Sequence, residues 1–110
     1  MNIEYLENNL LNVKDEKYLT VINFIIDAIR DYPEYELNDT AKYFNEVRKI
    51  LGTNEITSIT LKDYIDKNAN DDNENNIWIV SSLTSLFEAF DFMNLNKISF
   101  ENVLKEINSL

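Results

Sequence analysis

Cysteine and histidine are both absent from this chain of 110 residues. Their absence excludes a disulfide framework, Cys–His and Ser–His–Asp nucleophile systems, and zinc sites with thiolate or imidazole ligands. Glycine and proline occur once each, which excludes a glycine-rich phosphate loop. Paired carboxylates remain available, but among 20 acidic residues no spacing distinguishes one pair. We therefore expect a protein that is not an enzyme and has no cofactor and no bound metal ion.

Long apolar runs are missing as well. The longest, Phe24–Ile26 and Ile77–Val80, are far shorter than the roughly 20 residues of a membrane-spanning helix. The first residues, Met1–Glu4, lack the cationic and apolar regions of a signal peptide. We expect a cytoplasmic protein with no membrane partner.

Basic residues are scarce, with 10 Lys and Arg against 20 Asp and Glu, for a net charge of −10. Such a charge repels nucleic acids and anionic lipids and attracts basic proteins. The sequence pI is 4.3, whereas basic DNA-binding domains have values above about 9. The composition therefore predicts a basic protein partner and no direct contact with nucleic acid.

Hydrophobic residues make up 45% of the chain, enough for the core of one helical domain spanning residues 1–110. Their spacing predicts six helical segments, at residues 2–13, 16–31, 39–51, 60–68, 76–92 and 99–109. The segment at 16–31 is the most apolar and is expected to lie at the centre. The predicted fold class is all-α, an irregular bundle of about five to six short helices.

Residues typical of helix ends support these boundaries. Pro33 is expected to end the second segment, and Asn38 or Asp39 to cap the third. Gly52 fits a left-handed cap after the third segment, and Ser99 can cap the last. The spacing of Thr60 and Asp63 indicates a capping box, with residues 56–59 as an extended alternative.

Residues 87–107 resemble an EF-hand in outline, with Asp91 at the first loop position. The ligand positions then fail, because Met93, Leu95 and Asn102 stand where calcium needs oxygen donors. We interpret this stretch as a helix–loop–helix corner that Ser99 caps.

The negative charge is concentrated in two stretches. Residues 27–39, the first acidic window, and residues 63–74, the second acidic window, each carry a net charge of −4, while residues 40–62 carry +2. We expect partner contact from these windows and from the tryptophan that follows the second one. The candidate residues are Asp27, Asp31, Tyr32, Glu34, Tyr35, Glu36, Asp39, Asp63, Asp66, Asp71, Asp72, Glu74 and Trp78.

Aromatic residues alternate with acids in the first acidic window, as Asp31-Tyr32-Pro33-Glu34-Tyr35-Glu36. Tyrosine is enriched at binding hot spots, and carboxylates can meet Arg or Lys of a partner. Alternatively, the tyrosines pack onto the bundle while the acids face water. Trp78 lies off the apolar stripe of its helix, which allows either an exposed or a core position.

In overall character the chain resembles the immunity proteins of bacterial toxin systems, of the colicin or contact-dependent-inhibition type. The stretch Asp31-Tyr32-Pro33-Glu34-Tyr35 is similar in kind to the acid-and-tyrosine patch of colicin DNase immunity proteins. The resemblance implies binding and neutralisation of a cationic toxin domain such as a nuclease. Two alternatives remain open, a phage-encoded DNA-mimic inhibitor and a helical adaptor with a degenerate EF-hand-like corner.

Overall fold

The structure is a computed structural model that describes residues 1–34 and 37–110, and it is 74% helical. Its described residues form α1 (Ile3–Asn8), η1 (Leu10–Asn12, a 3-10 turn), α2 (Glu16–Asp31), α3 (Thr40–Leu51), α4 (Ser58–Asn68), α5 (Glu74–Leu95) and α6 (Phe100–Asn108). They contain no β-strand, only a bridge between Asn2 and Asp39. The predicted all-α bundle of about six helices is confirmed.

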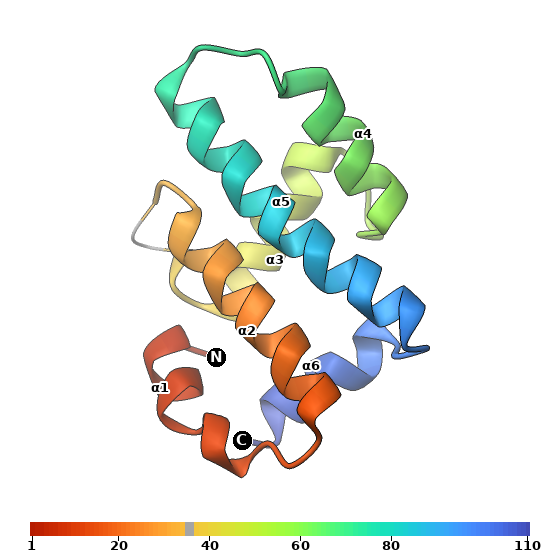
Figure 1. Ribbon diagram of the computed structural model, residues 1–110. Coiled ribbons are helices and arrows are strands. Elements are labelled where there is room, and N and C mark those ends of the chain that lie inside the picture. Colours follow the sequence, from red (N-terminus) through yellow and green to blue (C-terminus); the bar gives the residue numbers. More distant parts are fainter. Residues whose placement is uncertain (35–36) are drawn as a thin grey trace.

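Helices α2 and α5 form the centre of the bundle. They run antiparallel, so the C-terminal end of α2 lies beside the N-terminal half of α5, and α4 packs against α5 (Figure 1). All six helices contribute buried apolar side chains to one cluster. The β-branched residues of α2 lower its helix propensity, so this packing must hold the helix together.

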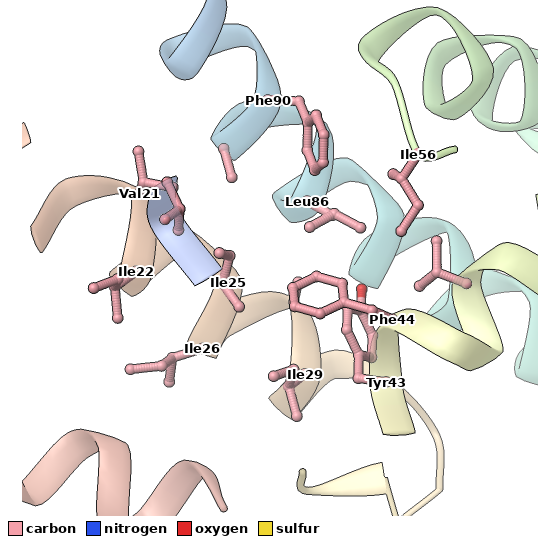
Figure 2. Packing of buried hydrophobic residues seen from close by; sticks show 14 of the residues in the cluster. Val21, Ile22, Ile25, Ile26, Ile29, Tyr43, Phe44, Ile56, Leu86 and Phe90 are labelled. Carbon is pink, nitrogen blue, oxygen red and sulfur yellow. The ribbon is translucent and has the colours of Figure 1, made fainter. Parts of the chain in front are cut away.

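Figure 2 shows how the core is filled. Leu86 of α5 lies among Ile25 of α2, Phe44 of α3, Ile56 and Phe90. Leu86 and Ile25 are fully buried. The apolar spacing predicted for residues 16–31 therefore gives a helix with the same bounds and the expected central place.

Several helix ends are where the sequence predicts them. Tyr32, before Pro33, adopts extended geometry and ends α2. Asp39 caps α3 by accepting from two backbone N–H groups, and Gly52 follows α3 with a φ of 67°. Ser99 accepts from the N–H of Asn102 and caps α6.

Other boundaries differ from the prediction. The capping box uses Thr57 and Thr60 in place of Thr60 and Asp63, so α4 begins at Ser58. The extended alternative for residues 56–59 is correct for Thr57 and wrong for Ser58 and Ile59, which belong to the helix. Helix α5 is longer than expected because Asn73 caps it three residues upstream of Asn76. The expected first segment breaks after Asn8, where Asn9 turns its amide onto the Tyr5 carbonyl oxygen at 2.8 Å. In residues 1–34 and 37–110, no helix combines the length and the apolar character needed to cross a bilayer.

The segment that resembles an EF-hand is a helix–loop–helix corner. Asp91 to Leu95 belong to α5, so they do not form a loop that could wrap an ion. The corner consists of residues 96–99, where Lys97 adopts a left-handed φ of 56°. Ser99 then starts α6, as the sequence predicts.

A buried hydrogen-bonded chain joins three helices in the core. The Tyr43 hydroxyl of α3 lies 2.7 Å from Ser82 Oγ of α5, and Ser82 donates to the Ala28 carbonyl oxygen of α2 at 2.6 Å. Because the serine proton goes to Ala28, the tyrosine is the donor to serine. Ala28 lies in the last turn of α2, where carbonyl groups lack helical partners. Ser82 therefore supplies a hydrogen-bond donor inside the core to a carbonyl oxygen at the C-terminal end of α2.

Candidate functional site

A hollow of about 480 Å³ lies at the C-terminal end of α2. Its volume is within the range of small-ligand pockets, about 300 to 1,000 Å³. Its walls come from α1, the end of α2, the segment that leads toward α3, and α5. The lining residues are Ile3, Ile29, Arg30, Asp31, Tyr32, Pro33, Glu34, Asn38 and Trp78.

The hollow forms because α2 stops where the chain turns away. The N–H of Tyr32 bonds to the Ile29 carbonyl oxygen at 3.3 Å and closes the last turn. Tyr32 adopts extended geometry before Pro33, and Pro33 has no N–H group with which to continue the helix. On the other side, the N–H of Ile3 bonds to the Asn38 carbonyl oxygen at 2.8 Å, which holds α1 beside the end of this segment. The last carbonyl groups of α2 add partial negative charge here.

Two carboxylates of the first acidic window line the hollow. Asp31 accepts a hydrogen bond from Ser81 Oγ at 3.0 Å, which fixes it against α5, while Glu34 is exposed. Arg30 also lines the hollow, but its guanidinium pairs with the Glu7 carboxylate. The lining charge therefore remains negative.

Tyr32 forms a wall of the hollow and does not protrude from it. Its side chain is 7% exposed and packs edge-on against Tyr43, with ring centroids 5.8 Å apart. Burial raises the pKa of Tyr32, and the carboxylates of Glu46 and Glu34 raise it further. The sequence allows Tyr32 either to contact a partner or to pack onto the bundle, and in the structure it packs onto the bundle. Tyr35 and Glu36 lie outside the described residues.

Trp78 is brought to the first acidic window although it follows the second one in the chain. It lies near the start of α5, which the antiparallel packing places beside the end of α2 (Figure 1). Its side chain is 48% exposed and lines the hollow. Sequence reasoning missed this neighbourhood, because the pairing of α2 with α5 cannot be read from either helix alone.

The remaining acids of the first acidic window have other surroundings. Asp27 is exposed on α2 and does not line the hollow. Asp39 is committed to internal contacts. Its carboxylate pairs with the Met1 amino group at 2.9 Å and accepts from the N–H groups of Ala41 and Lys42 at 2.9 and 3.2 Å. Its first role is to cap α3.

Replacing Asp39 with alanine is expected to lower the free energy of unfolding at pH 7 by about 1 kcal/mol. Partial burial would raise the pKa of Asp39, but hydrogen bonds from the Met1 amino group and from two backbone N–H groups outweigh it and lower the pKa. A lowered folded-state pKa adds stability above the unfolded value of about 3.9, and this stability is lost as pH falls through the folded value.

Urea unfolding at pH 7 and in strong acid measures this difference, with Asp27→Ala as the control for removing an exposed acid. The gap between wild type and Asp39→Ala should narrow at low pH. An equal gap at both pH values would show that the charge of Asp39 does not matter.

The second acidic window is not part of the hollow. Asp63 pairs with Lys67 at 2.9 Å and Asp66 with Lys62 at 3.4 Å, so two of its acids are neutralised on the surface of α4. The backbone N–H of Asn73 and the side-chain amide of Asn76 donate hydrogen bonds to Asp71 and lower its pKa. Asp72 and Glu74 are exposed. Across the described part of the chain, no group of three or more acids is arranged to hold a metal ion.

The site that emerges combines an aromatic side chain, two carboxylates and a helix C-terminus around one partly open hollow. Of the residues expected at a binding site, it unites Asp31, Tyr32, Glu34 and Trp78 and leaves the second acidic window elsewhere. No protein-family model, curated protein or solved structure matches this chain.

Proposed function

We propose that this protein binds and neutralises a basic protein partner, as an immunity protein acts on a cationic bacterial toxin domain of the nuclease type. The observation that carries the proposal is the hollow at the end of α2, which Trp78, Asp31 and Glu34 line together. Aromatic residues that are partly exposed among charged groups are typical anchors of protein interfaces. The net charge of −10 favours a basic partner.

Charge would act in two ways in such a complex. At long range, the acidic surface attracts the partner and speeds association, an effect that salt screens. At contact, the carboxylates bond to Arg or Lys side chains that would otherwise hold the phosphates of nucleic acid. Covering those side chains inhibits a nuclease without any chemistry by the inhibitor. The cysteine-free composition agrees with such a role in the cytoplasm.

The surface offers less to a DNA mimic. A mimic needs a run of unpaired carboxylates in place of phosphates. Here Lys62 and Lys67 neutralise Asp66 and Asp63, and an indole interrupts the acids at the hollow. The experiment below includes an outcome that would favour mimicry.

Reversing the charge at the hollow is expected to weaken binding of the basic partner about 100-fold, since two charge-assisted contacts are worth about 1.4 kcal/mol or more each. The variant is Asp31→Lys with Glu34→Lys. The matched control is Asp63→Lys with Asp66→Lys, which changes the net charge by the same amount at acids that are already paired on α4. The control should weaken binding of the basic partner only a few-fold, because it removes long-range attraction but no direct contact.

Affinity purification from the native host with mass spectrometry identifies the partner, and calorimetry at low and high salt then gives its affinity for each variant. Inhibition of the activity of the partner is measured in parallel. Equal losses in both double variants would place the contact elsewhere. A partner that is not basic would overturn the proposal. Displacement of the complex by added DNA is expected for either function, because both cover phosphate-binding side chains. Displacement by DNA together with equal losses in the two double variants would favour mimicry, which depends on the total negative charge. Circular dichroism confirms that each variant is folded, and Glu34→Lys alone tests the site without disturbing the bond from Ser81 to Asp31.

A further inference from the structure

The charges around the hollow leave it prepared for a cation. Arg30 is paired with Glu7, so its charge is already used. One carboxylate oxygen of Asp31 accepts a hydrogen bond from Ser81 Oγ, and Glu34 lines the hollow with an exposed side chain. The carbonyl end of α2 adds to the same negative field. Among residues 1–34 and 37–110, no basic side chain forms an ion pair with Asp31 or Glu34, so a positive group that enters the hollow need not displace one.

The walls of the hollow suit both the apolar stem and the positive end of a long basic side chain. Ile3, Ile29 and Pro33 are apolar and can cover a methylene stem. Trp78 presents a half-exposed indole, the aromatic ring that binds cations best. The hollow therefore suits a group that has a long apolar stem and a positive end.

Arginine meets these conditions better than the alternatives. Its planar guanidinium can stack on an indole and still donate to two carboxylates, whereas the lysine ammonium is compact and strongly hydrated. A second copy of this chain is disfavoured by mutual repulsion at −10 each, and a nucleic acid by its own negative charge. The occupant that fits is a side chain of a basic protein.

We propose that the hollow at the end of α2 is a socket for one arginine side chain of the basic partner, stacked on Trp78 and bonded to Asp31 and Glu34. This inference rests on the proposed function for the source of the arginine. It assigns the socket as the centre of the interface, where one anchored side chain gives much of the affinity.

The chain has a single tryptophan, so its fluorescence reports on this hollow alone. The probes are three acetylated and amidated tripeptides, Gly-Arg-Gly, Gly-Lys-Gly and Gly-citrulline-Gly. Citrulline keeps the shape of arginine without its charge. The arginine peptide should change the fluorescence of Trp78 with saturation at millimolar concentration, and lysine should bind several-fold more weakly, while citrulline gives no saturable change.

Amide and indole chemical shifts locate the bound peptide. The shifts should concentrate on Arg30–Glu34 and the Trp78 indole. Shifts spread equally over the acids of α4 would overturn the socket, as would equal binding of arginine and citrulline. Glu34→Gln should weaken the arginine peptide about ten-fold, since the carboxylate is one of its two bonds.

Two variants then separate the socket from the proposed function. Trp78→Ala should weaken the basic partner about 10- to 100-fold, as loss of a hot-spot aromatic does. Ile77→Ala is the matched control, because Ile77 is similarly exposed at the preceding position of α5 but does not line the hollow. If charge reversal weakens the partner and Trp78→Ala does not, the socket fails while the function stands. If the arginine peptide binds in the hollow but the protein binds no basic partner, the function fails instead.

Discussion

Leu86→Ala is expected to lower the free energy of unfolding by about 2–5 kcal/mol. Leu86 is fully buried and contributes to the contact of α5 with α2 and α3, among Ile25, Phe44 and Phe90 (Figure 2). Removing its side chain costs the transfer free energy and leaves a cavity that a close-packed core fills only in part. The free energy of unfolding of a small domain is about 5–15 kcal/mol, so this one change removes a large part of the stability.

Leu95→Ala is the matched control for this variant. Leu95 is 76% exposed at the end of the same helix, so the same truncation should change stability by no more than about 0.5 kcal/mol. Urea denaturation with a common slope gives both values. Similar losses in the two variants would mean that Leu86 is not at the centre of the core.

The second large effect is expected at Ser82, where alanine should cost about 1–3 kcal/mol. The serine hydroxyl is the partner of both the Tyr43 hydroxyl and the Ala28 carbonyl oxygen. Tyr43 is fully buried, so without serine its hydroxyl has no water to replace the lost bond. Most of the lost stability therefore comes from leaving the buried Tyr43 hydroxyl without a hydrogen-bond partner, and less from the lost hydrogen bond itself.

The variant Tyr43→Phe gives the test. It removes the buried hydroxyl but leaves serine bonded to Ala28, so it should cost only about 0.5–1.5 kcal/mol. In the double variant, alanine at position 82 no longer strands a phenol. Its cost there should be smaller than in wild type, and strictly additive losses would contradict the coupling of the two hydroxyls.

Local features of the fold could be predicted from the sequence because they depend on neighbouring residues. The apolar spacing of residues 16–31 gives α2 with its observed ends, and Asp39, Gly52 and Ser99 act at the helix ends where the sequence predicts them. The predicted start of α4 is wrong because Thr57 and Thr60 form a capping box that lacks the expected acidic residue. Two hydroxyls satisfy the same N–H groups, and the pattern with Glu or Gln does not include them.

The candidate site could be predicted only in part. The sequence shows the acids and aromatics of residues 31–34 as a cluster and predicts Trp78 as a contact residue. Their proximity depends on how α5 packs on α2, which is a property of the assembled core. The burial of Tyr32 against Tyr43 depends on a third helix and was equally hidden. Composition indicated which residues could bind, and packing decided which of them meet.

The walls of the hollow come from residues that are far apart in the chain, from Ile3 to Trp78. An unfolded chain cannot hold these segments together, so whatever occupies the hollow binds the folded state alone. By thermodynamic linkage, the occupant then stabilises the docking of α1 and α5 on α2, by an amount that grows with its concentration. A partner bound there would act as an additional piece of the core, and the complex would resist heat and proteolysis better than the free protein.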